Sequence, residues 1–214
     1  PANFFSSYLN LFDLLFGRSC TIRHRTFLIT GTTGAFGSAM KRRIEALGGQ
    51  VEKARHGVDF APGDVERMRQ KLEWADVLIL SHGAKGAEAW DANYTTFADL
   101  SDLFITMGKD RLVPPEIWAV GSEAEFHGDM GQADLVDYAA SKRAFGRRAL
   151  SYYRSPDVLY RHIVPSAFTS QMGPGPMSAA IWAGVVPRAT SRAEPSGRVT
   201  RIIWDIEKSA FLAG

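Results

Sequence analysis

Residues 26–37 read Thr-Phe-Leu-Ile-Thr-Gly-Thr-Thr-Gly-Ala-Phe-Gly, an apolar run that leads into a glycine-rich turn. The β-branched and aromatic residues of 26–30 predict a buried strand, and the glycines predict a tight turn that opens a helix. The free N–H groups at the start of a helix attract phosphate, so this turn is a candidate nucleotide-binding site. Its glycines are three residues apart, which departs from Gly-x-Gly-x-x-Gly, and an ordinary strand-to-helix turn is the alternative. The residues expected to contact a nucleotide here are Gly31, Thr32, Thr33, Gly34, Ala35, Phe36 and Gly37.

Short apolar runs alternate with helical patterns along most of the remaining chain. This rhythm predicts parallel strands joined by right-handed helical crossovers. The predicted fold class is therefore α/β, a doubly wound parallel sheet of the Rossmann type. The strand at 51–55 is unusually charged, so we expect it to be short or to lie near an edge of the sheet. The other predicted strands are 26–30, 77–80, 117–120, 158–164 and 199–206, and the predicted helices are 35–47, 64–72, 93–107 and 138–152.

The composition is that of an ordinary globular protein. Of the 214 residues, 45% are hydrophobic and 22% are charged, and 25 basic against 23 acidic residues give a net charge of +2. This balance excludes a disordered chain and gives no basic footprint for nucleic acid. The single cysteine, Cys20, excludes an intramolecular disulfide, and no stretch reaches the roughly 18 apolar residues of a membrane span. We expect one Rossmann-like domain at 21–214 in an intracellular protein, either cytoplasmic or organellar.

The segment 1–20 precedes this domain and has the pattern of an amphipathic helix. Its large apolar residues fall on one arc of a helical wheel, with Ser6, Asn10 and Asp13 opposite. Such an arc packs either on its own domain or on an external surface, and its polar side lacks the basic residues usual at a lipid interface. We expect 1–20 to dock on a partner subunit or a membrane surface, which would make the protein peripheral to a membrane. The arc consists of Phe4, Phe5, Tyr8, Leu9, Phe12, Leu15 and Phe16.

Four polar residues lie where a doubly wound sheet binds its ligands. Tyr138 and Lys142 are four residues apart on one helix face, so the ammonium is expected to lie near the phenol and to lower its pKa. Ser122 follows the strand 117–120 at its carboxyl end, and Asn93 begins the helix after the preceding strand. We expect these four side chains to converge on one cleft.

From Thr26 onward, these motifs resemble the short-chain dehydrogenase/reductase family. The resemblance implies that Tyr138 transfers a proton, that Lys142 lowers the tyrosine pKa and holds the nicotinamide ribose, and that Ser122 orients the substrate oxygen. It also implies that Asn93 anchors a water molecule leading to the lysine. Where the family has Asn-Ala-Gly and Pro-Gly, this chain has departed from the pattern, and the implied cofactor contacts are Ser81, His82, Gly83, Pro165 and Ser170.

Three further stretches narrow the resemblance. Residues 121–125, 141–146 and 175–179 are similar to the reductase-like domain of cyanobacterial bifunctional sterol desaturase/short-chain dehydrogenase proteins. That similarity implies a lipophilic substrate. Between 165 and 179 there is little room for the helical lid common in the family, so we expect an open site.

The predicted second strand ends at Arg55, where the adenine ribose of a cofactor would lie. An arginine accommodates the 2′-phosphate of NADP(H), whereas a carboxylate selects NAD(H), so we expect NADP(H). An arginine that is merely exposed at a strand end is the alternative. His82 is expected to pack or hydrogen-bond rather than to act in catalysis, and Glu123 and Glu125 have no histidine at metal-ligand spacing, so no metal is expected.

Two functions therefore remain open. The first is an NADP(H)-dependent oxidoreductase that acts on a carbonyl or alcohol, and the second is an accessory subunit of a larger complex that keeps the reductase fold. The four converging polar residues favour the enzyme. The short lid and the apolar segment 1–20 favour the subunit.

Overall fold

Six parallel strands form one open sheet in the computed structural model, which describes residues 22–126, 133–165, 170, 172–173 and 178–180 and the backbone of 202–203. The strand order is β2-β1-β3-β4-β5-β6, so the chain runs from β1 outward to β2 and then back past β1 to β3. This order confirms the predicted doubly wound sheet. The strands are β1 (Thr26–Thr30), β2 (Gln50–Ala54), β3 (Val77–Leu80), β4 (Glu116–Val120), β5 (Leu159–Val164) and β6 (Ile202–Ile203).

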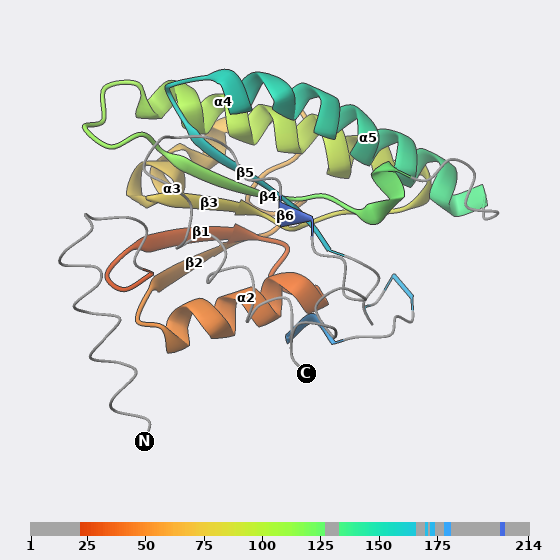
Figure 1. Cartoon of the computed structure of the whole chain (residues 1–214), viewed down its shortest axis with the longest axis horizontal. Helices are drawn as coiled ribbons and strands as arrows, with labels where there is room; N and C mark the ends of the chain where they lie inside the picture. The colour runs from red at the N-terminus through yellow and green to blue at the C-terminus, as the bar shows by residue number, and fades with distance from the viewer. Residues whose placement is uncertain are drawn as a thin grey trace.

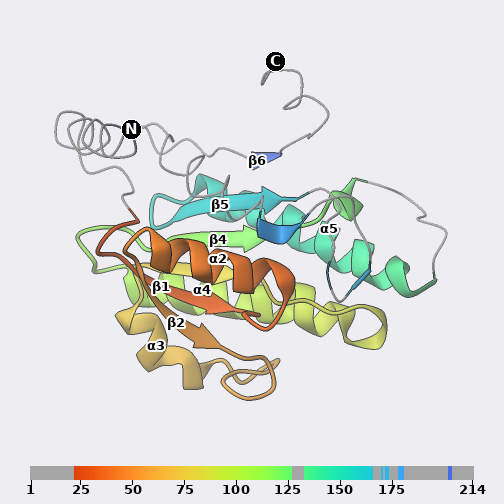
Figure 2. The same ribbon diagram turned by 90° about the horizontal axis from the view of Figure 1, so that it is seen from below.

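Helices cover both faces of this sheet (Figure 1, Figure 2). In Figure 1, α4 and α5 lie above the sheet and α2 lies below it. No helix in the described parts of the chain is long and apolar enough to cross a membrane. The helices are α2 (Ala35–Ala46), α3 (Arg69–Trp74), α4 (Thr96–Gly108) and α5 (Ala133–Arg154), with short helical turns at η1 (Glu66–Met68), η2 (Gly86–Glu88), η3 (Asp91–Thr95) and η4 (Glu123–Glu125).

The alternation of side chains along the strands divides the core into two layers. Leu28 of β1 and Leu78 of β3 belong to the layer under α3, α4 and α5, whereas Phe27 belongs to the layer under α2. Trp118 of β4 is wholly buried in the α2 layer, where its ring meets Phe27 edge-on with the centroids 5.8 Å apart. Because both faces of the central strands are covered, these strands are continuous apolar runs in the sequence.

The charged strand β2 lies at the edge of the sheet, as its composition predicted. The predicted helix 64–72 is a 3-10 turn that becomes α-helical only at Arg69, and the predicted helix 93–107 opens with the π-helical turn η3. From the predicted last strand 199–206, Ile202–Ile203 pair with β5. The rest of that strand and the segment 1–20 lie outside the described residues, so the docking of 1–20 stays a prediction.

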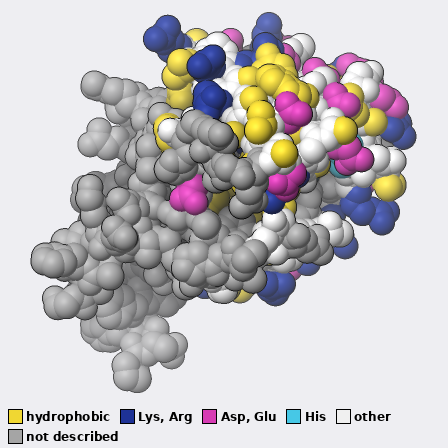
Figure 3. All heavy atoms as spheres, turned by 90° about the vertical axis from the view of Figure 1, so that its right-hand side faces the viewer, with side chains coloured by type: hydrophobic (Ala, Val, Ile, Leu, Met, Phe, Trp, Pro, Cys, Tyr) yellow, Lys and Arg dark blue, Asp and Glu magenta, His cyan; other side chains and the backbone are white. Residues whose placement is uncertain are grey.

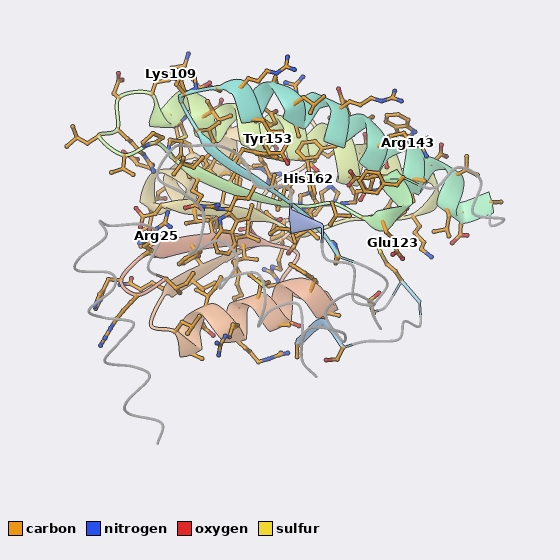
Figure 4. The ribbon with its side chains drawn as sticks, in the orientation of Figure 1. Arg25, Lys109, Glu123, Arg143, Tyr153 and His162 are labelled. Atoms are coloured by element: carbon orange, nitrogen blue, oxygen red, sulfur yellow. The ribbon has the colours of Figure 1, made fainter. Side chains whose placement is uncertain are left out.

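A buried carboxylate joins the amino-terminal ends of β4 and β5. Oε1 of Glu116 accepts hydrogen bonds from Nε of Arg161 at 2.6 Å and from Nε1 of Trp118 at 2.7 Å. Its Oε2 lies 2.8 Å from Nη1 of Arg25, which precedes β1 and is labelled in Figure 4. Burial by itself raises the pKa of Glu116, but the two guanidinium groups outweigh burial and leave this pKa below its usual value. The ion cluster therefore holds three strands at this end of the sheet.

We expect Glu116→Ala to lower the free energy of unfolding by about 3–5 kcal/mol, because the exchange leaves Arg161 buried without its carboxylate. Urea denaturation followed by circular dichroism measures this change. Glu45→Ala is the control, since Glu45 pairs with Lys41 on the exposed surface of α2 and its loss should cost less than about 1 kcal/mol. A Glu116→Ala loss as small as that of the control would contradict the structural role of the cluster.

Candidate functional site

The glycine-rich turn lies where the chain changes direction in the sheet. β1 is flanked by β2 and β3, so the chain leaves β1 toward one side of the sheet and later continues on the other side. Doubly wound sheets bind their ligands in the crevice at this point of reversal. Gly31 has a φ of +71°, and a Cβ added there would lie 2.6 Å from both N and Cα of His82. A Cβ added at Gly37 would lie 2.4 Å from the carbonyl oxygen of Gly31. Both positions therefore require glycine, and the first turn of α2 packs directly on the ends of β1 and β3.

A cavity of about 540 Å³ opens at the carboxyl ends of the strands. Its wall includes the segments that follow β1, β2, β3, β4 and β5, together with one face of α5. Figure 3 shows the molecule from the side of these strand ends, where hydrophobic and acidic side chains lie close together. Of the predicted site residues, Thr32, Gly37 and Asn93 do not line the cavity. Those that do are Gly31, Thr33, Gly34, Ala35, Phe36, Arg55, Ser81, His82, Gly83, Ser122, Tyr138, Lys142, Pro165 and Ser170.

Ser122 and Tyr138 meet in this cavity although a long segment separates them in the sequence. The hydroxyl of Ser122 accepts a hydrogen bond from the backbone N–H of Ala124 at 3.2 Å and so caps η4. The same hydroxyl is hydrogen-bonded to the Tyr138 phenol. Residues 127–132, which lie between the two, are outside the described residues. The structure thus brings together the predicted proton donor and the predicted substrate-orienting group.

The acidity of Tyr138 differs from the sequence-based prediction. Burial raises the pKa of Tyr138, the hydrogen bond with Ser122 opposes this, and the carboxylates of Glu125 and Glu123 raise the pKa further. The predicted lowering by Lys142 is wrong for this structure because the ammonium is engaged elsewhere. Tyr138 is consequently a protonated phenol at neutral pH.

Lys142 is buried at the cavity wall. Its Nζ donates to the carbonyl oxygen of Val120 at 2.9 Å and lies 4.4 Å from the centroid of the Phe97 ring, a cation–π distance. Burial lowers the pKa of Lys142 to about 8, while the charge of Glu125 acts in the opposite direction. The ammonium is therefore charged at neutral pH and loses its proton in mildly basic solution.

Asn93 lies wholly buried in the π-helical turn η3. Its Nδ2 donates to the carbonyl oxygen of Ala84 at 2.8 Å and to Oγ of Ser141 at 3.2 Å, while its Oδ1 accepts from the N–H of Ala84 at 3.2 Å. These bonds connect the loop after β3 to α5, the helix that carries Tyr138 and Lys142. Asn93 therefore supports the site, and its role toward a water molecule stays a prediction.

His82 is held by two threonines beneath the glycine-rich turn. Its Nδ1 lies 2.7 Å from Oγ1 of Thr30, and its Nε2 lies 2.8 Å from Oγ1 of Thr96. Burial lowers the pKa of His82 well below its usual range, and the nearby charges of Lys142 and His56 add to this lowering. The imidazole is therefore neutral, and the packing and hydrogen-bonding interpretation of His82 is confirmed.

Arg55 follows β2 directly, is exposed and lines the cavity. A carboxylate that no sequence motif indicated lies nearby: Oδ2 of Asp59 accepts from the backbone N–H of Arg55 at 2.7 Å, and its Oδ1 lies 3.3 Å from Nζ of Lys71. Burial raises the pKa of Asp59, but the Arg55 hydrogen bond and the Lys71 ammonium outweigh burial and lower it. Asp59 does not line the cavity, so the charged group presented there is the arginine.

Several residues that line the cavity were not predicted from the sequence. Lys85 and Glu88 follow β3, and the only sequence signal for them was their place after a strand. Nζ of Lys85 donates to the carbonyl oxygen of Met172 at 2.9 Å and lies 3.4 Å from Oδ2 of Asp134. Apolar side chains also enter the wall, notably Val58 and Met172. The cavity thus combines charged and apolar surfaces.

Comparison with known proteins places the fold. No protein-family model matches the chain. A curated relative, monoglucosyldiacylglycerol epimerase from Synechocystis sp., is 26% identical in an alignment 211 residues long, and the match covers 85% of this chain and 50% of the relative. The chain therefore spans about half the length of that curated relative.

Solved structures share the architecture over most of their length. A short-chain dehydrogenase from Burkholderia cenocepacia in complex with NADP has a TM-score of 0.69 at 16% identity, over 91% of this chain and 94% of that chain. A short-chain type dehydrogenase/reductase from Mycobacterium marinum has a TM-score of 0.70 at 14% identity, over 86% and 96%. The chain has the short-chain dehydrogenase/reductase fold. A short-chain dehydrogenase from Sphingobium yanoikuyae in complex with NADPH agrees, with a TM-score of 0.61 at 18% identity, over 89% and 92%. The short-chain dehydrogenase/reductase resemblance drawn from the sequence is thus confirmed for the fold, which does not by itself establish an activity.

Acid is expected to destabilise the protein through His82. In the unfolded chain this imidazole takes up a proton below about pH 6.5, whereas the folded site excludes the proton, so stability is complete above that pH and falls by about 1.4 kcal/mol per unit below it. Urea denaturation between about pH 7 and about pH 5 measures this slope. In His82→Gln, which keeps an amide beside the threonines but does not titrate, the slope should be shallower. Equal slopes for the two proteins would refute the assignment of a neutral His82.

Proposed function

We propose that the protein is a nicotinamide-dependent oxidoreductase that moves hydride between the cofactor and a carbonyl or alcohol carbon. The observation that carries this proposal is the hydrogen-bonded pair of Tyr138 and Ser122 in the cavity beneath the Gly31 turn. Carbonyl reduction by a nicotinamide needs a proton donor and a nucleotide site in one cavity. The alternative function, that of an accessory subunit, was based on the segment 1–20 and on the short lid at 165–179. Most residues of these two segments lie outside the described residues.

The residues of the cavity fit such a cofactor. Because Gly31 and Gly37 leave no room for side chains, the backbone N–H groups of the turn and of α2 would hold the pyrophosphate. Arg55 would contact the 2′-phosphate of NADP(H), and Lys142 would contact the nicotinamide ribose. When bound, the cofactor supplies or accepts the hydride. The walls between these contacts would come from Ser81, His82, Gly83, Pro165 and Ser170.

Tyr138 would supply the proton in the reductive direction. Its raised pKa keeps the phenol protonated at neutral pH, and the Ser122 hydroxyl beside it would hold the substrate oxygen. The substrate carbon gains the hydride, its oxygen takes the phenolic proton, and solvent returns a proton to Tyr138. Lys142, whose pKa is about 8, would stay charged at neutral pH where it contacts the nicotinamide ribose. Oxidation reverses these transfers.

We propose further that the substrate is lipophilic and carries a secondary alcohol or the corresponding ketone. The curated relative is named for a glycolipid and for its epimerisation. Inversion of a hydroxyl-bearing carbon follows when hydride is removed and then returned to the opposite face, with no net change in the cofactor. The apolar Val58 and Met172 and the charged Lys85 and Glu88 would suit a polar group attached to a lipid.

We expect Tyr138→Phe to lower turnover by roughly 10²- to 10⁴-fold, because the phenylalanine has no proton to transfer. NADPH oxidation at its absorbance band is followed with a panel of ketones, and sugar inversion is followed by mass spectrometry of a monoglucosyl lipid incubated with NADP⁺. NADPH binding, measured by fluorescence, should persist in the variant. Tyr153→Phe, on the same helix but outside the cavity lining, is the matched control. A Tyr138→Phe protein as active as this control would exclude the proposed mechanism.

Arg55→Asp is expected to weaken NADPH binding by about tenfold or more, because the exchange removes a charge-assisted hydrogen bond to the 2′-phosphate and adds a repulsive charge. NADH binding should weaken less or improve. Fluorescence titration of both nucleotides measures the two affinities, with Arg154→Asp at the end of α5 as the control. If the natural chain binds NADH as tightly as NADPH and Arg55→Asp changes neither affinity, the preference for NADP(H) is refuted.

A further inference from the structure

A buried glutamate, histidine and tyrosine form a chain of hydrogen bonds directly behind the proposed site. Nε2 of His162 lies 3.0 Å from each carboxylate oxygen of Glu125, and its Nδ1 lies 3.0 Å from the hydroxyl of Tyr160. The side chains of Glu125 and His162 are only 3% and 2% exposed. Figure 4 shows His162 on β5 beneath α5. These partners favour the tautomer in which Tyr160 donates to Nδ1 and Nε2–H donates to the carboxylate.

Glu125 connects this chain to the site through the backbone of Ser122. Its Oε1 accepts the Ser122 N–H at 2.9 Å, while the Ser122 side chain caps the same short turn, so the two residues hold each other. Glycines on two sides leave room for the carboxylate. A Cβ at Gly121 would lie 2.1 Å from Oε1, and a Cβ at Gly146 would lie 2.8 Å from Oε2. The position of Ser122 therefore depends on the side chain of Glu125.

Titratable and charged groups face Glu125 from two elements. α5 contributes Tyr138, Lys142 and Arg143, and β5 contributes His162, behind which lies Tyr160. Glu123 of η4 acts on Tyr138 as well. Arg143 is directed to the backbone, since its Nε donates to the carbonyl oxygen of Glu125 at 3.0 Å.

The charge of Glu125 acts on both proposed catalytic groups. Burial lowers the pKa of Lys142, and the carboxylate works against that lowering. Burial raises the pKa of Tyr138, and the carboxylate adds to that rise. Both effects stabilise the protonated form of the group concerned.

We infer that Glu125, held by His162, is a positioning residue that fixes the Ser122 backbone and places a buried negative charge at the site. That charge favours the protonated forms of Lys142 and Tyr138. Its consequence for turnover rests on the proposed function, whereas its electrostatic effect on Lys142 does not. The Glu125–His162 pair thereby contributes to the pH range in which the site has a charged lysine and a protonated phenol.

The test is the titration of Lys142 in Glu125→Gln, which keeps the shape of the side chain and loses its charge. The ¹³Cε resonance of Lys142 is followed against pH in lysine-labelled protein and is assigned by its loss in Lys142→Arg. We expect a midpoint near pH 8 in the natural chain and a midpoint lower by about one pH unit in Glu125→Gln. The pH above which turnover falls, measured at saturating cofactor and substrate, should be lower in the same variant.

Two exchanges of His162 separate charge from packing. His162→Phe removes the donor that holds the Glu125 carboxylate in place, so the carboxylate is no longer fixed at the site and the Lys142 midpoint should fall here too. His162→Gln keeps an N–H donor, so the midpoint should stay near that of the natural chain.

The inference is overturned if a folded Glu125→Gln or His162→Phe protein keeps the natural midpoint. It is also overturned if His162→Gln lowers the midpoint as much as Glu125→Gln does. If Glu125→Gln does not fold by circular dichroism, His162→Phe decides the question. A protein that turns over none of the substrates would refute the proposed function, while the Lys142 titration would still decide the present inference.

Discussion

The backbone of the turn after β1 packs directly against the backbone that follows β3, and this contact determines where the other parts of the site lie. At Gly31 even one added carbon would collide with His82. Because the two strand ends lie so close, Thr30 reaches the next strand: its Oγ1 accepts from the Ser81 N–H at 3.1 Å and lies beside His82. His82 in turn contacts Thr96 at the start of α4. A line of hydrogen bonds thus runs from the end of β1 through His82 to the start of α4.

The other half of the site is built on α5. One face of this helix carries Tyr138 and Lys142 to the ends of β3 and β4, and Asn93 fastens the helix to the loop after β3 through Ser141. The position of the helix is also set by packing in the core behind the cavity, including the aromatic contact of Phe145 with Phe97. The chemistry proposed for this site therefore depends on the core as much as on the residues that line the cavity.

Features that depend on the local sequence pattern could be predicted, whereas features that depend on contacts between residues distant in the chain could not. Central strands covered on both faces are uninterrupted apolar runs, so β1, β3 and the order of elements could be anticipated, as could the gathering of Ser122 and Tyr138. The acidity of Tyr138 could not, because its pKa depends on burial and on the charge of Glu125. His162 was missed for a similar reason: it lies 37 residues from Glu125 in the chain and belongs to no motif. The π-helical turn around Asn93 likewise has no sequence signature that a count of helical periods would detect.

The edge position of β2 has a consequence for how the molecule behaves among its copies. An edge strand exposes unpaired backbone groups that another chain can extend into a larger sheet. β2 carries Glu52 and Lys53 where a central strand would carry valine or isoleucine, and Glu52 is tied to Lys71 of α3 with Nζ and Oε1 3.0 Å apart. A strand docking from another molecule would have to desolvate these charges. The same residues that made β2 a poor strand in the sequence thus protect the sheet from intermolecular pairing and aggregation.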